Sequence, residues 1–191
     1  MKNNKLVAAT LLFMVTGGVN TAFADNYAID SAHTFPNFTI NHLGFSTMHG
    51  RFNTTKGKLS IDMAKKTGSV EITIDAASVD TGFKKRDDHL RSADFFNVNE
   101  FPEITFKSTK VSFKGDDKAS VDGEITIKGV SKPITLSVDH IKCGVHPMNK
   151  KQVCGFNATT TLKRSDFGVK YGIPAIGDEV NITLEAEAVK S

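Results

Sequence analysis

The sequence contains no tryptophan and only two tyrosines, although 14 of its residues are phenylalanine. Aromatic side chains of this kind carry almost no polar groups that need a hydrogen-bond partner, which suits an apolar interior. The same residues can either fill a dry core or line a hollow one. Composition leaves both interpretations open, and the pattern alone favours the filled core.

Several motifs of common enzymes are also absent. The sequence has no G-x-S-x-G, no G-x-x-x-x-G-K-[ST], no G-x-G-x-x-G and no H-E-x-x-H. The chain therefore lacks the motifs that usually identify hydrolases, nucleotide-binding proteins and metalloproteases. We predict a protein that is not an enzyme, with no catalytic residue and no metal.

Long apolar runs are missing after residue 24, so no later stretch approaches the roughly 20 residues of a membrane-spanning helix. Near the start, Lys2 and Lys5 precede an apolar run that ends at the small-residue site around Ala24. This pattern predicts a secretory signal peptide over residues 1–24, cleaved near Ala24. Residues 25–191 then have a length that fits one soluble domain.

An excess of positive charge is missing as well. Removal of Lys2 and Lys5 with the leader takes the formal net charge from +3 to +1. The remaining lysine clusters are short and scattered, which is typical of solvated faces and turn flanks. We therefore expect no nucleic acid partner.

Apolar and polar residues alternate in eight stretches, as they do in strands with one buried face. Short turns join most of them, so the sequence predicts an all-β fold, an eight-stranded antiparallel up-and-down barrel, with a sandwich as the fallback. A change of parity predicts one bulge at Gly57 and another between Phe106 and Val111. The eight strands are expected near residues 38–42, 52–61, 70–74, 104–113, 121–127, 134–140, 156–162 and 180–186.

One segment between the third and fourth strands has a helical period instead. Leu90, Ala93 and Phe96 follow one another at intervals of three, which suits one face of a short helix, and Phe101-Pro102 ends it. We predict a short helical plug that covers one mouth of the barrel.

The two cysteines, Cys143 and Cys154, flank a loop between the sixth and seventh strands. In a secreted chain with no other thiol, this arrangement favours a disulfide that staples the hairpin. The alternative is a zinc site in which His140 and His146 join the two thiolates.

Two groups of titratable residues resemble catalytic sets but have simpler explanations. His33, His42 and His49 lie within one predicted hairpin without a carboxylate at a telling spacing, which favours structural roles. Asp87 precedes His89 near the predicted helix start, where an acid is favoured by the helix dipole.

Three long segments resemble the YceI-like family of secreted bacterial lipid-binding proteins. They are RDDHLRSADFF at 86–96 with FPEITF at 101–106, GEITIKGVSKPITL at 123–136, and RSDFG at 164–168 with GDEV at 177–180. The openings YAID at 27–30 and FTINHLG at 38–44 also fit, so the resemblance covers residues 25–191.

This resemblance implies an extended lipocalin-like barrel in the periplasm, whose long cavity binds an isoprenoid-tailed amphiphile. The ligand would be a polyisoprenoid or a quinone-type lipid, held by a carrier or sequesterer without any other cofactor. The alternative is an accessory redox or stress-response protein that presents a quinone to a membrane redox protein. The family has no agreed catalytic residues, so none is carried over.

Strand alternation groups the apolar residues that share a face, and we assign one set to the cavity as a hypothesis. This set runs along the barrel and includes four residues near the mouth. The predicted ligand-binding residues are Phe38, Ile40, Phe52, Ile72, Ile74, Ile104, Phe106, Ile125, Ile127, Leu136 and Val138, with Leu90, Phe95, Phe96 and Phe167 near the mouth.

The polar head group of the ligand needs partners at the mouth, and His42, Asn41, Arg86 and Arg91 are the nearest candidates in sequence. The Gly-rich loop at 172–177 is either a flap that touches a membrane transiently during ligand exchange or a plain connection. Monomer and homodimer both remain open.

Overall fold

The computed structural model describes residues 24–191. The predicted signal peptide lies outside the described residues, apart from Ala24. Within them, the model contains no helix long and apolar enough to cross a membrane.

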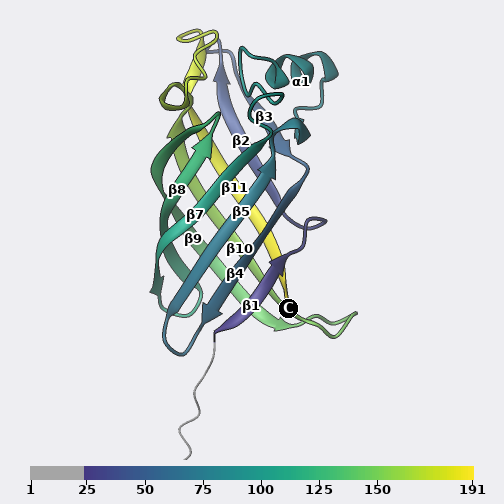
Figure 1. Cartoon of the computed structure of the whole chain (residues 1–191), viewed down its shortest axis with the longest axis vertical. Coiled ribbons are helices and arrows are strands. Elements are labelled where there is room, and N and C mark those ends of the chain that lie inside the picture. Colours follow the sequence, from purple (N-terminus) through teal and green to yellow (C-terminus); the bar gives the residue numbers. More distant parts are fainter. Residues whose placement is uncertain (1–23) are drawn as a thin grey trace, which may run out of the picture.

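Strands dominate the described chain, together with one α-helix and two short 3-10 turns (Figure 1). The α-helix is α1 (Lys84–Arg91), and the 3-10 turns are η1 (Ala76–Ser78) and η2 (Arg164–Phe167). The strands are β1 (Asp25–Ile29), β2 (Phe35–His42), β3 (Ser46–Phe52), β4 (Thr55–Asp62), β5 (Thr67–Asp75), β6 (Val79–Asp80), β7 (Glu103–Lys114), β8 (Lys118–Ile127), β9 (Val130–Val145), β10 (Gln152–Lys163) and β11 (Ile176–Lys190).

The sheet closes on itself. Its order is β1-β4-β5-β7-β8-β9-β10-β11, and an additional pairing of β1 with β11 completes the ring of eight strands. Every pair is antiparallel, and β2, β3 and β6 extend the wall beside β11 at the end that carries α1 (Figure 1). The predicted eight-stranded antiparallel barrel is confirmed.

The wall next to β11 contains two strands, which pair with different parts of β11, and the next place along the wall also contains two strands. β1 pairs with the last residues of β11, and β2 pairs with an earlier part of the same strand. Likewise β3 pairs with β2, whereas β4 pairs with β1 and β5. A two-residue break at 53–54 separates β3 from β4 and accounts for the parity change between Phe52 and Leu59.

The predicted bulge at Gly57 is therefore wrong, because Gly57 pairs with Ile72 in an unbroken register. A glycine is needed there for another reason. A Cβ atom on Gly57 would lie 2.3 Å from the carbonyl oxygen of Glu71, closer than packed atoms allow. The second predicted bulge is confirmed, since the register of β7 against β8 shifts between Ser108 and Lys110.

The helical segment is shorter than its apolar period predicted. α1 ends at Arg91, and the amide N–H groups of Phe96 and Asn97 close turns onto the carbonyls of Leu90 and Ser92. Ala93 is exposed, so the predicted third position of the helix face is wrong. Leu90 and Phe96 still pack against the same buried cluster, because the turn brings Phe96 back beneath the helix.

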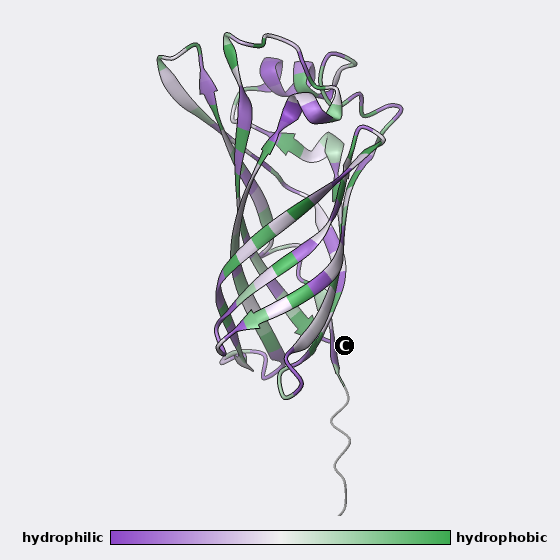
Figure 2. Cartoon of the chain, turned by 90° about the vertical axis from the view of Figure 1, so that its left-hand side faces the viewer, coloured by the Kyte–Doolittle hydropathy of each residue, from purple (hydrophilic) through white to green (hydrophobic). Residues whose placement is uncertain are grey.

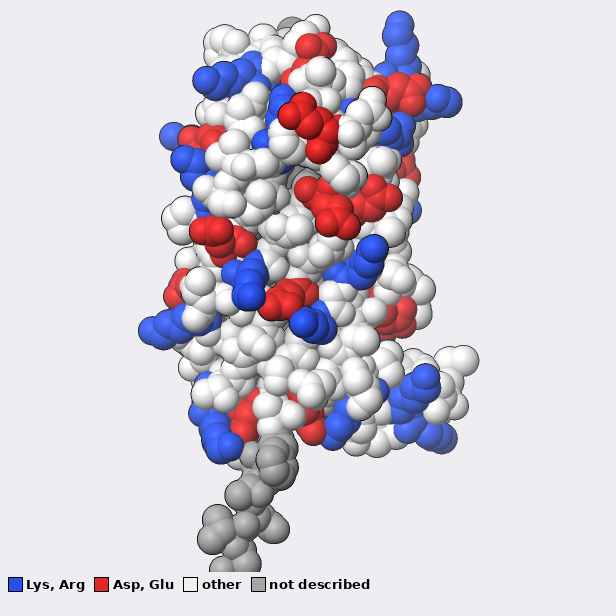
Figure 3. All heavy atoms as spheres, in the orientation of Figure 1, with Lys and Arg blue, Asp and Glu red and all other residues white. Residues whose placement is uncertain are grey.

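The outer face of the barrel is polar and carries mixed charge. Hydrophobic and hydrophilic bands alternate along the strands, as expected when one face is turned inward (Figure 2). In the view of Figure 3, acidic and basic side chains are interspersed and form no stripe of one sign. One such group links three strands, where Glu71 contacts Lys58 at 3.0 Å and Lys107 at 3.1 Å.

The cysteine prediction is confirmed, because Cys143 and Cys154 form a disulfide. The two residues lie directly opposite each other on β9 and β10, near the protruding hairpin at the end of the barrel away from α1 (Figure 1). Since the bond uses both sulfurs, no thiolate remains for the zinc site considered above.

Candidate functional site

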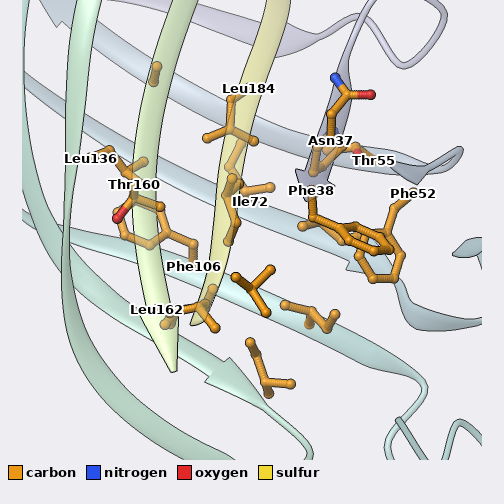
Figure 4. A pocket seen from close by; sticks show the side chains of 18 of the residues that line it. Asn37, Phe38, Phe52, Thr55, Ile72, Phe106, Leu136, Thr160, Leu162 and Leu184 are labelled. Atoms are coloured by element: carbon orange, nitrogen blue, oxygen red, sulfur yellow. The ribbon is translucent and has the colours of Figure 1, made fainter. Parts of the chain in front are cut away.

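A cavity of about 820 Å³ runs through the barrel. Its lining comes from strands on all sides and from α1, and it is almost wholly apolar. Figure 4 shows part of the lining, where side chains such as Phe38, Leu136, Thr160 and Leu184 project into a common space. The interior of this protein is a chamber rather than a filled core, so the interpretation favoured by the sequence pattern alone is wrong.

Two features of the lining accompany the hollow interior. Inward side chains such as Ile72, Ile125 and Leu184 line the cavity and are only partly buried. Small residues also occupy inward positions of β8 and β10, where Ala119 and Ala158 line the cavity. An eight-stranded barrel with larger residues at these positions could fill its own interior.

The two ends of the barrel differ. At the end opposite α1, Tyr27, Leu59 and Ala188 form a buried cluster that packs the bottom of the barrel. At the α1 end, the lining includes side chains that are largely in solvent, among them Phe83 (56% exposed) and Tyr171 (51% exposed). The cavity therefore opens at the α1 end of the barrel.

Every residue predicted to face the ligand lies along this cavity, including those assigned to the mouth, and so does His42. Ligand contact by these residues stays a prediction. The inward assignment succeeds because the parity of each strand fixes a single face and the structure turns that face inward. The residues of this set that line the cavity are Phe38, Ile40, His42, Phe52, Ile72, Ile74, Leu90, Phe95, Phe96, Ile104, Phe106, Ile125, Ile127, Leu136, Val138 and Phe167.

The sequence prediction missed the contribution of the last two strands. Thr160 and Leu162 of β10, and Val180, Ile182 and Leu184 of β11, all line the cavity. Their alternation identified the two strands, and the same parity argument could have selected their inward faces.

Two of the four candidates for the head group do not face the cavity. Asn41 is exposed, and its Oδ1 accepts a hydrogen bond of 2.9 Å from the N–H of Gly44 in the β2–β3 turn. Arg91 donates to the carbonyls of Ala77 (2.7 Å) and Val79 (3.0 Å), which fixes it against η1 and β6. Each side chain is held by backbone groups outside the lining, so neither lies with the residues that face the cavity.

Arg86 does line the cavity, and the loop before α1 holds it in place. Its Nε and Nη2 donate to Oγ1 and to the carbonyl of Thr81, both at 2.7 Å. The buried carboxylate of Asp87 accepts from the N–H of Thr81 at 2.9 Å and also from its hydroxyl. Asp87 is therefore a structural residue in the first turn of α1, in line with the sequence interpretation.

Arg164 is a buried cation at the mouth that the sequence prediction did not include. Its side chain is 6% exposed and lines the cavity, and all its hydrogen bonds go to backbone carbonyls. The acceptors are Gly177 (2.7 Å), Tyr171 (2.9 Å), Val169 (3.1 Å) and Ile176 (3.1 Å). Burial lowers the pKa of Arg164, although a guanidinium stays protonated near neutral pH.

These bonds anchor the loop of residues 168–175 beside the mouth. The same loop contacts the plug through Tyr171, whose ring centroid lies 4.9 Å from the ring centroid of His89 and 5.4 Å from that of Phe95. At the base of the loop, Asp178 accepts from the N–H (2.9 Å) and the hydroxyl (2.7 Å) of Ser165. These hydrogen bonds lower the pKa of Asp178. The movement expected of a flap at 172–177 stays a prediction.

One group of potential metal ligands lies outside the cavity. Asp30, His33 and Glu187 place their ligand atoms within 4.8 Å of one another where β1 passes into β2. Nδ1 of His33 contacts Asp30 at 2.9 Å, and this pair raises the pKa of His33 and lowers that of Asp30. The sequence prediction recognised no carboxylate at a telling spacing and so missed Asp30, three residues before His33, while Glu187 comes from the far end of the chain.

The sequence matches the YceI-like domain over residues 27–188. The chain belongs to the YceI-like family. It is 39% identical to a UPF0312 protein of Ectopseudomonas mendocina over the whole of both chains, and 38% identical to one of Pseudomonas aeruginosa over 97% of this chain and 98% of that one.

Solved structures share the YceI-like barrel. The structure of BcnA from Burkholderia cenocepacia superposes with a TM-score of 0.74 at 28% identity, over 83% of this chain and 98% of that one. The YCEI protein of Campylobacter jejuni gives 0.71 at 27% identity, over 97% and 99% of the two chains. A polyisoprenoid-binding domain from Saccharophagus degradans gives 0.65 at 18% identity, over 86% and 98%, a likeness of fold alone.

Proposed function

We propose that this protein binds an amphiphile with a long apolar tail, such as a polyisoprenoid, inside the barrel. The observation that carries the proposal is the apolar chamber of about 820 Å³, whose lining reaches exposed side chains at the α1 end. A YceI-like neighbour of the same fold is described as a polyisoprenoid-binding domain, which supports this ligand class. The role is binding, with no catalytic step.

The strength of binding follows from the tail. Each buried methylene contributes about 0.8 kcal/mol, so about ten of them contribute about 8 kcal/mol before the cost of association. A gain of this size holds a tail that would otherwise be in contact with water. Tail length therefore sets affinity until the chamber is full.

We further propose that the protein carries or sequesters its ligand in the periplasm. The disulfide between Cys143 and Cys154 supports an oxidising compartment. The predicted leader supports export in the same way. A quinone is one candidate for the bound lipid, and a membrane redox partner would then receive it.

The ligand must leave a membrane to reach the chamber, and exposed apolar side chains around the opening support transient membrane contact. Phe45 is 89% exposed and Leu43 is 49% exposed at the β2–β3 turn, and the N–H of Leu43 bonds to the carbonyl of Ala175 in the loop after η2. With Phe83 and Tyr171 they form a broken apolar rim. In a flotation assay with phospholipid vesicles, the Phe45→Ser variant should no longer float with the vesicles. The control variant Met148→Ser, in the hairpin away from α1, should still float with them.

The direct test of binding is to purify the protein from its own compartment under native conditions and extract it with organic solvent. Mass spectrometry of the extract should find a stoichiometric isoprenoid, quinone or other long-chain amphiphile. A protein that carries no lipid and also fails to bind added long-chain alcohols would contradict the proposal.

A further inference from the structure

The charges that line the cavity have one sign. Among the described residues, the charged members of the lining are Lys85, Arg86 and Arg164, and none is Asp or Glu. All three lie at the open end, two on α1 and one on η2. The remainder of the lining is mostly apolar and contains no other Lys or Arg, so a ligand meets these cations as it enters.

The carboxylates near the plug are engaged elsewhere. Asp88 contacts Nζ of Lys84 at 2.7 Å and Nη1 of Arg91 at 3.0 Å. Asp94 contacts Nε2 of His89 at 3.0 Å. None of these acids lines the cavity, and each has its own cationic or imidazole partner. The buried Asp87 accepts from Thr81 beside Arg86 and is also outside the lining, so the lining itself contains cations but no acid.

The three cations also keep donors or charge available. Arg86 uses Nε and Nη2 on the backbone and hydroxyl of Thr81, which leaves Nη1 out of these bonds. Lys85 is exposed at the rim. Arg164 donates its hydrogen bonds only to neutral carbonyls, and its charge also interacts with the nearby carboxylate of Asp178, which does not line the cavity.

We propose that the mouth binds an anionic head group, a carboxylate or a phosphate, whose tail occupies the barrel. This inference rests on the proposed binding function and names the chemistry of the ligand's polar end. Attraction between a charge and its partner is stronger beside a low-dielectric wall than in water, so the apolar rim strengthens the selection. An amine of the same tail would meet repulsion, and an alcohol would gain no charge interaction.

The experiment compares ligands that share one tail. Delipidated protein is titrated near pH 7.5 with hexadecanol, hexadecylamine, hexadecanoate and hexadecyl phosphate, each displacing the neutral fluorescent probe N-phenyl-1-naphthylamine. We expect at least one of the two anions to bind about tenfold more tightly than the alcohol, the usual gain from a charged hydrogen bond, and the amine to bind more weakly than the alcohol. The preference should shrink as salt rises.

Lys85→Glu and Lys84→Glu are matched variants. They introduce the same charge at adjacent exposed positions, but only Lys85 lines the cavity, whereas Lys84 pairs with Asp88. Lys85→Glu should lower the ratio of anion to alcohol affinity about tenfold or more, and Lys84→Glu should leave that ratio near its wild-type value.

The outcomes separate the two proposals. Equal binding of alcohol and anions, or a preference for the amine, would overturn the anionic head group and leave the lipid-binding function standing. If no probe binds, the proposed function itself fails. A preference for hexadecyl phosphate over hexadecanoate supports a lipid phosphate as the natural source, and the reverse supports a fatty-acid type of ligand.

Discussion

The replacement Thr160→Trp should partly block the chamber. Thr160 lines the cavity from β10 and faces its interior (Figure 4). Thr159, the preceding residue, is exposed on the outer face of the same strand. Thr159→Trp is therefore a control with the same substitution and the opposite orientation.

The size of the effect follows from the space that is lost. Tryptophan adds about seven heavy atoms to the threonine side chain. If the tail bends around the indole, about four methylenes lose their place in the chamber, at about 0.8 kcal/mol each. Binding of a long tail should weaken by about 3 kcal/mol, on the order of 100-fold in Kd, whereas short tails should be little affected.

The natural sequence has no tryptophan, so each variant carries a single indole that reports its own environment. Emission of Thr160→Trp should be blue-shifted and should change when lipid is added, and emission of Thr159→Trp should do neither. Titration with alcohols of increasing length supplies the affinities. Equal affinities for the two variants at every length, with both indoles in water, would refute the inward orientation of Thr160 and the ligand chamber with it.

Three further predictions concern stability. Thr55 is 1% exposed and its Oγ1 has no hydrogen-bond partner, so Thr55→Val should raise the free energy of unfolding in urea by about 1 kcal/mol, and a decrease would show that the hydroxyl is satisfied. Replacing both Cys143 and Cys154 with serine should cost about 3 kcal/mol in the loop-entropy account, again read in urea, with lipid affinity unchanged because the hairpin lies away from the mouth. Asp178 has a lowered pKa in the fold, so its stabilising effect is present above about pH 4 and is lost as the pH falls through the folded value. The difference in Tm between wild type and Asp178→Asn should therefore narrow in acid, and a constant difference from pH 7 to pH 3 would contradict this.

The local pattern of the chain favoured the barrel and was enough to predict the faces of its strands. Alternation with a period of two places Ile72 and Ile74 on one side of β5 whatever the rest of the chain does, because successive side chains point to opposite faces. The same rule selected Phe38 and Ile40, and the pair of cysteines was readable from their positions at the ends of two neighbouring strands.

The prediction from apolar alternation was wrong at the point where the chain changes its pairing partner. The shift between Phe52 and Leu59 was visible in the sequence, but its cause, the break between β3 and β4, depends on which strands lie beside each segment. The end of α1 at Arg91 was set in the same way, by turns that bring Phe96 back to the buried cluster. Local periodicity contains no information about such contacts.

The sequence by itself determined which residues share a face, since this follows from backbone geometry, and it favoured a barrel over a sandwich. Only the tertiary structure decided that the interior is hollow, because the volume left inside depends on how far side chains from opposite walls reach. It also decided the charge of the mouth. Arg164 and Lys85 are 79 residues apart in the sequence and share the opening only because closure of the barrel brings η2 to the side of α1.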